Sequence, residues 1–199
     1  MGYKVTNTAA TTAAVTNRFV TSVAMKVGSY TVANASPVWS GACFVTVTHT
    51  INDTLDTLGT ITVTGTNLAG QAQSESITPV NGTTATSTKM YRTVTAVTGV
   101  GWVQGGSGAD TIVVGCAAGN IACGTGGTLG GVLVNNSVAA AITISHAGGT
   151  IMTVPASAAA GTYYNLGGVD FAGFLKVSTT STNDVSVFHT PTIPTFATA

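Results

Sequence analysis

The chain has 199 residues, which is enough for one large or two small domains with a buried core. Only 6% of the residues are charged, against roughly 25% in ordinary soluble domains, and the six basic and six acidic side chains cancel. The cations are scattered along the sequence, which excludes the basic patch that a nucleic-acid partner needs, and no apolar run approaches the roughly 18 residues that would argue for a membrane partner.

Threonine dominates the composition and glycine occurs 25 times, whereas the strong helix formers other than alanine are scarce. Threonine and valine favour pleated surfaces and glycine favours turns, so the composition predicts an all-β fold. A chain with so few charges either wets its surface with Thr, Ser and Asn or has that surface covered in an assembly. The start MGYKVTNTAATTAAV lacks the apolar segment of a secretion signal, so we expect synthesis in a cytoplasm.

Residues 1–40 are expected to form an extended N-terminal arm, because apolar and polar residues do not alternate before RFVTSVAMKV. One short strand is possible near residues 19–27. From residue 41 the alternation becomes dense, and ACFVTVTHT places Cys43, Val45 and Val47 on one face of a strand. Residues 41–115 are therefore predicted to form a first β-sandwich lobe.

The stretch GTITVTGTNLAGQAQSESITP predicts a hairpin within this lobe. Ile61 and Val63 point inward, residues 67–70 turn the chain, and QAQSESIT returns it. Asn81 and Gly82 suit the next tight turn because both tolerate positive φ. The segment KMYRTVTAVTGVGWV follows, and its period slips near Arg92, which indicates a bulge.

Residues 116–131, CAAGNIACGTGGTLGG, are predicted to be a flexible linker because their glycine density leaves little to bury. Residues 132–199 contain further strand candidates at a spacing of about 8 to 12 residues, typical of a small sandwich or barrel. These candidates are VLVNNS, AAITISHAGG, TIMTVP, TYYNLGG, FAGFLKVSTT and DVSVFHTP. The sequence thus predicts two small antiparallel β-sandwich or barrel-like lobes, the second ending in an extended tail.

Residues suited to catalysis or to metal binding are few. His49, His146 and His189 lie on distant segments, and none has metal-ligand spacing to another His, Cys or carboxylate. Asp53 and Asp56 form the only close carboxylate pair; a Ca²⁺ loop is one interpretation, and ordinary turn formation is the favoured one.

Two glycine-rich motifs fall short of known catalytic or phosphate-binding patterns. Ser107 in GGSGA lacks the last glycine of a nucleophile elbow, and GTGGTLGG lacks the lysine of a phosphate loop. We therefore predict no catalytic residue, no cofactor-binding residue and no metal ligand, and do not expect an enzyme.

The three cysteines, Cys43, Cys116 and Cys123, are too few for a disulfide framework. Cys116 and Cys123 flank AAGNIA and could meet across a turn, but a reducing compartment favours free thiols. Among the aromatic residues, one group falls in the second lobe, where its members form either the core, which is favoured, or a carbohydrate platform. This group comprises Tyr163, Tyr164, Phe171, Phe174 and Phe188. Trp39 and Trp102 suit the first lobe's core or an oligomer contact.

A run of motifs between about residues 41 and 115 resembles a module recurrent in tailed-bacteriophage structural proteins. The module has a T-V-T-G-T-[ND]-x-x-G strand and turn, an S/T-E strand, an N-G-T turn and a K-x-[FY]-x-T-V-T strand. The matching residues here are Thr62, Val63, Thr64, Gly65, Thr66, Asn67, Gly70, Ser74, Glu75, Asn81, Gly82, Thr83, Lys89, Tyr91, Thr93, Val94 and Thr95. The later GVLVNNS and DVSVFH segments are similar to the small β lobe of phage decoration proteins, with Phe174 and Leu175 where that pattern has Gly and Leu.

This resemblance implies a capsid decoration (cement) protein of a bacteriophage virion, assembled in the host cytoplasm, without enzymatic activity or cofactor. Such a protein stabilises the capsid by bridging subunits of the major capsid protein from outside. A homo-oligomer is implied, with a trimer favoured by the local threefold symmetry of many capsid sites, and the N-terminal arm is an expected contact. Open alternatives are a tail-tube, head-fibre or adaptor component, and a carbohydrate-binding adhesin that stacks sugars on Tyr163, Tyr164 or Trp102.

Overall fold

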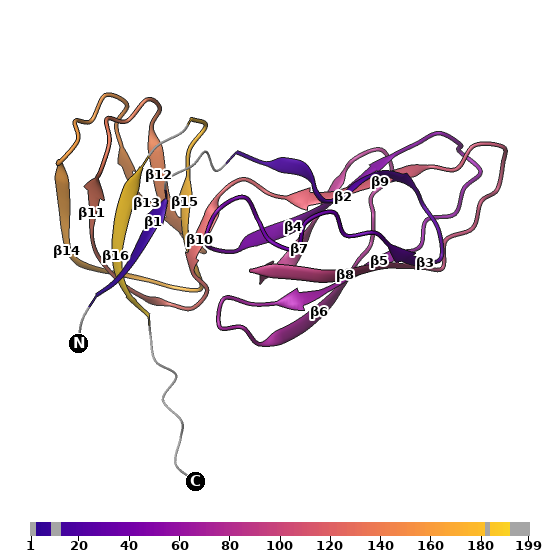
Figure 1. Ribbon diagram of the computed structural model, residues 1–199, viewed down its shortest axis with the longest axis horizontal. Helices are drawn as coiled ribbons and strands as arrows, with labels where there is room; N and C mark the ends of the chain where they lie inside the picture. The colour runs from indigo at the N-terminus through magenta and orange to yellow at the C-terminus, as the bar shows by residue number, and fades with distance from the viewer. Residues whose placement is uncertain (1–2, 9–12, 182–183, 192–199) are drawn as a thin grey trace, which may run out of the picture. The chain divides into compact units, whose positions relative to one another are not determined.

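The computed structural model describes residues 3–8, 13–181 and 184–191, and in this part of the chain every regular element is a β-strand. The strands form four antiparallel sheets of four strands each, drawn in Figure 1. The chain divides into two compact units: the first lobe spans residues 13–118, and the second contains residues 1–12 together with 119–199. The predicted all-β fold with two antiparallel lobes is confirmed. The described residues contain no helix that is long and apolar enough to cross a membrane.

The first lobe is a sandwich of two sheets. One sheet has the order β2 (Val15–Ala24), β9 (Thr111–Cys116), β4 (Cys43–Thr50) and β7 (Thr84–Tyr91). The other has the order β3 (Gly28–Tyr30), β8 (Thr93–Val100), β5 (Thr60–Thr66) and β6 (Ala72–Ile77). Val45 and Val114 from the first sheet and Ile61 and Val97 from the second belong to one buried cluster. The alternating residues of both sheets therefore supply a single core.

The second lobe repeats this architecture. One sheet has the order β1 (Lys4–Thr8), β16 (Val185–Pro191), β11 (Gly127–Val134) and β14 (Tyr163–Phe171). The other has the order β10 (Asn120–Cys123), β15 (Leu175–Ser178), β12 (Ile142–His146) and β13 (Gly149–Val154). Leu129 and Val187 of the first sheet pack in one cluster with Ile144 and Val177 of the second.

The predicted hairpin forms as β5 and β6. Their antiparallel register runs from Ile61 opposite Ile77 to Thr66 opposite Ala72, and Ile61 and Val63 are fully buried. The turn is built by Asn67, whose side-chain oxygen accepts hydrogen bonds from the backbone N–H groups of residues 69 and 71, while Gly70 takes a φ of 79°. A residue with a side chain would be strained at that φ, which explains the glycine.

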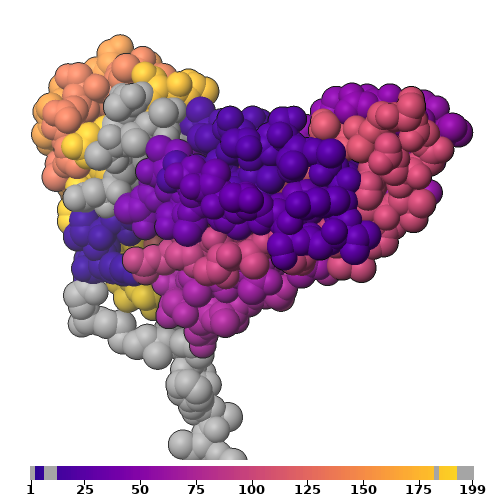
Figure 2. Space-filling model, turned by 45° about the vertical axis from the view of Figure 1, so that its right-hand side comes forward, coloured from indigo at the N-terminus to yellow at the C-terminus, as the bar shows by residue number. Residues whose placement is uncertain are grey.

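The first 40 residues differ from the expected extended arm. Phe19 and Val20 on β2 are 0% and 2% exposed and lie in the first lobe's core, as does Trp39. Figure 2 shows this segment, in indigo, spread over one face of the first lobe. Two register shifts interrupt the pairing of β2 with β9, and such bulges remove the period of two from the sequence. The short strand considered near residues 19–27 overlaps β2, but for that reason its full length and its place in the core did not show in the sequence.

The N-terminal strand β1 belongs to the second lobe, where it pairs with the last strand, β16. The register runs from Lys4 opposite His189 to Thr8 opposite Val185, and the indigo strand lies beside the yellow one in Figure 1. The segment that sequence alone assigns to an arm thus contains strands of both lobes.

Residues 116–131 are not a linker. They contain β10, whose four residues are all buried, and the first part of β11. The glycines are used where other chain segments lie on the backbone: a Cβ atom at Gly127 would lie 2.2 Å from the carbonyl oxygen of Thr190. Glycine density here reflects close packing rather than flexibility.

Candidate functional site

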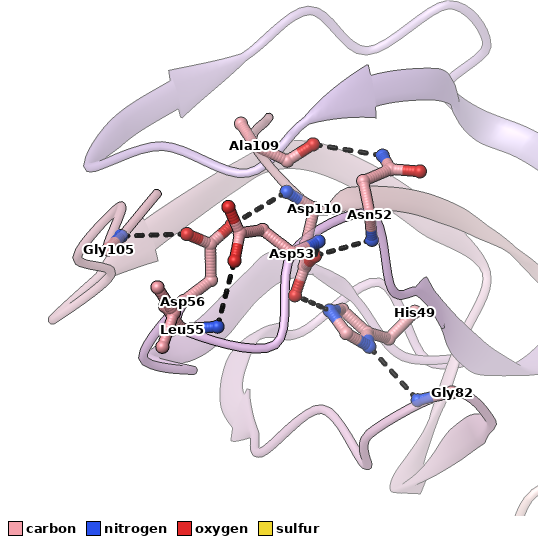
Figure 3. A network of polar contacts seen from close by, with 9 residues as sticks. All are labelled: His49, Asn52, Asp53, Leu55, Asp56, Gly82, Gly105, Ala109 and Asp110. Atoms are coloured by element: carbon pink, nitrogen blue, oxygen red, sulfur yellow. Dashed lines mark hydrogen bonds and ion pairs between the residues drawn. The ribbon is translucent and has the colours of Figure 1, made fainter. Parts of the chain in front are cut away.

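The described polar residues gather most densely around His49, at the end of β4 (Figure 3). His49 Nε2 lies 2.9 Å from Asp110 Oδ2, and the backbone N–H of Gly82 donates to His49 Nδ1 at 3.1 Å. Because Nδ1 accepts a hydrogen bond, Nε2 carries the proton and donates it to Asp110. The backbone N–H groups of Asn52 and Asp53 donate to Asp110 Oδ1 at 2.7 and 2.9 Å. One buried carboxylate therefore joins a strand end to the loop that follows it.

These contacts determine the ionisation of Asp110. Burial raises the pKa of its carboxyl, but the hydrogen bonds from the backbone of Asp53 and Asn52 and from His49 outweigh burial, so the net pKa is lowered. Asp110 is 2% exposed. No edge of this carboxylate is open to a substrate, so the pair holds loops together and has none of the access that an acid–base catalyst needs.

Asp53 and Asp56 have the same loop-building role. Asp53 Oδ1 accepts the backbone N–H of Leu55 at 2.9 Å. Asp56 accepts the backbone N–H groups of Gly105 and Asp110, at 2.7 and 2.9 Å. The two carboxylates bind N–H groups of the chain, which is the turn-forming interpretation of this pair.

The other histidines lie apart from this network. His146 Nδ1 accepts long hydrogen bonds from the backbone N–H groups of Gly148 and Ala172, both at 3.4 Å. His189 is fully buried in the second lobe, where its Nε2 lies 3.1 Å from Thr6 Oγ1 on β1. Burial, together with the nearby charge of Lys4, lowers the pKa of His189 to about 4. The described residues contain no cluster of three or more His, Cys, Asp or Glu side chains that would suit a metal ion.

All three cysteines are free and buried, and the pair that meets is not the pair suggested by sequence spacing. Cys116 ends β9 in the first lobe, whereas Cys123 lies in the second lobe and donates its thiol hydrogen to the carbonyl oxygen of Thr125 at 3.2 Å. Cys43 and Cys116 lie on the paired strands β4 and β9, and a hydrogen bond between their side chains, followed by burial, raises the pKa of Cys43. Neither thiol is poised for nucleophilic chemistry. Ser107 lies exposed in the loop before β9.

The aromatic side chains divide between core and surface. Trp39 and Trp102 are 6% and 8% exposed and lie in the first lobe's core, so neither offers a stacking face. Phe171 lies in the core of the second lobe and Tyr164 packs against it, but Tyr163 is 51% exposed. Phe174 and Phe188 are partly buried.

The outer side of the β3–β8–β5–β6 sheet is rich in hydroxyl side chains, with Ala72, Ala96 and Val100 among them, and we call it the hydroxyl face. Its hydroxyl residues are Ser29, Thr60, Thr62, Thr64, Thr66, Ser74, Ser76, Thr93 and Thr98. One row crosses the whole sheet, from Ser29 through Thr98 and Thr62 to Ser76. All of these side chains are exposed or partly exposed, and none is charged.

Hydrogen bonds between neighbouring strands order this face. Thr62 Oγ1 lies 3.0 Å from Ser76 Oγ, Thr64 Oγ1 lies 3.2 Å from Ser74 Oγ, and Thr66 Oγ1 lies 2.7 Å from Thr93 Oγ1. Each pair restricts the rotamers of two side chains, and each hydroxyl keeps capacity for a further hydrogen bond. The result is a rigid, neutral surface that offers both apolar contact and hydrogen-bond capacity.

The neighbouring edge of the sandwich is closed by side chains. Glu75 on β6 accepts the backbone N–H groups of Thr88 and Lys89 on β7, at 2.7 and 2.9 Å, and the hydroxyl of Thr88 at 2.9 Å. Lys89 Nζ in turn donates to the carbonyl oxygen of Ser74 at 2.7 Å. These bonds occupy groups that an edge strand would otherwise offer to another chain, so an added strand is disfavoured on this side. The open surface next to it is the hydroxyl face.

The polar network around His49 and the free thiols thus stabilise the fold, and the hydroxyl face is the surface of the first lobe best suited to a partner. Sequence analysis predicted that Ile61 and Val63 point inward, but it did not show that the hydroxyl residues on the other side align across four strands. Comparison with protein-family models, with curated proteins and with solved structures gives no significant match to this chain.

Proposed function

We propose that the chain is a non-enzymatic structural protein of a phage virion, which binds the outer surface of the capsid and stabilises it by bridging subunits of the major capsid protein. The observation that carries the proposal is the hydroxyl face: β5, β6 and β8, from the stretch with the phage-like motifs, form most of an ordered and exposed surface of uncharged side chains. In the polar network around His49, Asp110 and Asp56 accept hydrogen bonds from backbone N–H groups, which agrees with a structural role.

The physical properties of this face suit permanent attachment to another protein. Threonine offers a methyl group and a hydroxyl group on one short side chain, so little rotamer entropy is lost when the face is covered. A contact without ion pairs is hardly screened by salt, and many copies on one shell convert a modest affinity into high occupancy. The partner surface is expected to be neutral and β-rich, with hydrogen-bonding groups facing outward.

The proposal places the capsid contact on the hydroxyl face and not on an N-terminal arm. Residues 15–24 form β2, and their side chains help to build the first lobe's core. A homo-oligomer with threefold symmetry remains part of the proposal by analogy with capsid sites. Among virion proteins, a tail-tube, head-fibre or adaptor component is the alternative.

The test is co-sedimentation of the purified chain with emptied heads assembled from the major capsid protein of the same phage genome. We expect saturable binding at a fixed ratio to the capsid subunit, with little change between about 0.15 M and about 0.5 M NaCl. Binding only to tails or tubes, or no binding to heads, would refute the proposal. Negative-stain images of the free protein separate rings or tubes from small oligomers.

A matched pair of variants locates the contact. Thr62→Lys puts a charge on the hydroxyl face, at a residue hydrogen-bonded across the strands to Ser76. Thr84→Lys is the control, because Thr84 is exposed and makes the same kind of bond, to Thr48 at 2.8 Å, on the opposite sheet. We expect Thr62→Lys to lower head occupancy at least tenfold and Thr84→Lys to leave it unchanged. Equal effects of the two variants would contradict the assignment of the face.

A further inference from the structure

Two tyrosine rings lie directly on the backbone of β11 in the second lobe. A Cβ atom at Gly130 would lie 2.5 Å from Cε1 and Cζ of Tyr3, and one at Gly131 would lie 2.4 Å from the hydroxyl oxygen of Tyr163. Against β16, Leu129 and Gly131 oppose the consecutive residues His189 and Phe188, so Gly130 is an extra residue in β11. Against β14 the register shifts at the same point, but there the extra residues lie on β14. Such a bulge lets two successive residues face the same side. Only glycine leaves room for both rings there.

The rings belong to an exposed patch on the outer side of the β1–β16–β11–β14 sheet. We call Tyr3, Val5, Tyr163 and Phe188 the aromatic patch. Tyr3 is 53% exposed, Val5 49% and Tyr163 51%, and Val5 is the register partner of Phe188. Tyr163 and Phe188 meet edge to face, with ring centroids 6.0 Å apart and planes at 83°. The backbone at Gly131 and the ring of Phe188 fix the position of the Tyr163 ring, so the exposed part of this ring is pre-organised for binding.

The second lobe has only two acidic and two basic side chains. Thr128 donates to Asp170 Oδ1 at 3.0 Å, and Asn135 donates to Asp184 Oδ1 at 2.8 Å. The cations of the second lobe are Lys4 and Lys176, given by the sequence. Lys176 lies on β15 in the other sheet, and Lys4 is the register partner of the inward-facing His189, one residue out of phase with Val5. Lys4 is exposed and lies between Tyr3 and Val5 in the sequence, but a single cation does not make the basic patch that a nucleic acid needs.

We propose that the aromatic patch is a carbohydrate-binding site for a neutral, pyranose-based polymer. The C–H face of a pyranose ring is flat and apolar, and it stacks on exposed aromatic rings; Tyr3 and Tyr163 are both about half exposed. The hydroxyl groups of a sugar are donors, and Asp170, on the same strand as Tyr163, is an exposed acceptor. This function goes beyond the proposed capsid attachment: it belongs to the other lobe and to a different class of ligand.

Biolayer interferometry of the full chain on surfaces coated with dextran, laminarin, mannan, galactan or xylan tests the site. We expect binding to at least one of these polymers, a loss of at least tenfold in affinity for Tyr163→Ala, and a change of less than about twofold for Tyr163→Phe, which keeps the ring. Leu55→Ala is the matched control, because Leu55 is an exposed apolar residue (68%) of the first lobe. Unchanged amide hydrogen exchange of β16 shows that the second lobe of each variant is folded.

Three outcomes would overturn the proposal: no binding of the wild-type chain to any of the five polymers, an equal loss in Leu55→Ala, or stronger binding to the anionic polymer heparin than to the neutral ones. Sedimentation velocity supplies a further check. If the wild type self-associates and Tyr163→Ala is monomeric, the patch is a contact between copies and not a sugar site. Head binding by Tyr163→Ala should stay at the wild-type level, so failure of this proposal is distinguishable from failure of the capsid proposal.

Discussion

Replacing Asp110 with asparagine tests the claim that one buried carboxylate joins the loops at the end of the first lobe. Asparagine keeps the shape of the side chain but has one acceptor oxygen and one donor group in place of two acceptors. In the wild type, Oδ1 accepts two backbone N–H groups and Oδ2 accepts the Nε2–H of His49. Whichever way the amide is oriented, its NH₂ group faces a donor, so at least one buried donor loses its partner.

The expected cost follows from the bonds that are lost. A hydrogen bond to a charged group contributes about 1.5–3 kcal/mol, and a buried donor left without an acceptor costs about 1–3 kcal/mol, counted once because the two overlap. The free energy of unfolding of the first lobe should therefore fall by about 1.5–3 kcal/mol. The folded-state pKa of Asp110 lies below its unfolded value, so this stabilisation is present above pH of about 3.9 and is lost as pH falls through the folded-state pKa.

Tryptophan fluorescence during urea unfolding measures this lobe alone, because the chain's two tryptophans, Trp39 and Trp102, both lie in its core. Asp184→Asn is the matched control: Asp184 accepts from the side chain of Asn135 in the second lobe, and its loss should leave the tryptophan transition unchanged. A fall of less than about 0.5 kcal/mol for Asp110→Asn, the range of ordinary surface substitutions, would refute the reasoning.

Three further predictions concern other parts of the fold. Because the pKa of His189 is about 4 in the folded chain and about 6.5 when unfolded, the unfolded state binds the proton first, and the second lobe should lose about 3 kcal/mol between pH 6.5 and pH 4. Hydrogen exchange of the β16 amides measures this slope; if His189→Gln does not flatten it, another group is responsible. Glu75→Ala removes the acceptor of two backbone N–H groups on β7 and should lower the stability of the first lobe by about 1–3 kcal/mol and promote association at that edge, as urea titration and light scattering can show. An unchanged urea midpoint would count against this. A thiol reagent should label none of the three buried cysteines in the native chain and all three after denaturation, and rapid native labelling would contradict their burial.

Much of the fold could be predicted because alternation and turn chemistry are local signals. The β5–β6 hairpin followed from inward Ile61 and Val63 and from the turn at Asn67 and Gly70. The strand candidates after residue 131 likewise correspond to β11 through β16. Strands β5, β6, β12, β15 and β16 each have one side with regular pairing, and in the others the register shifts at a single point, so the period of two survives over most of each strand.

The parts that could not be predicted depend on contacts between distant segments. Strand β2 contains bulges that interrupt its alternation. Among the described residues, strand β1 pairs only with β16, which lies at the far end of the sequence, so no local pattern predicts it. Residues near Arg92 were expected to bulge within one strand; instead the chain passes there from β7 in one sheet to β8 in the other. Glycines 130 and 131 resemble a flexible linker until Tyr3 and Tyr163 are placed on them. Composition alone does not distinguish a glycine in a flexible segment from a glycine that is required because another side chain lies against the backbone.

The placement of the acidic residues explains why the candidate surfaces are neutral. All six acidic side chains accept hydrogen bonds inside the fold: Asp53, Asp56, Glu75 and Asp110 from backbone N–H groups, and Asp170 and Asp184 from neighbouring side chains. Carboxylates used in this way stabilise loops, edges and neighbouring side chains, and the hydroxyl face itself is built from uncharged residues. The position of the N-terminal strands determines how the capsid proposal must be tested. Truncating the first 27 residues removes β1 and β2 and would destabilise both lobes, so only point substitutions on the hydroxyl face separate loss of contact from loss of fold.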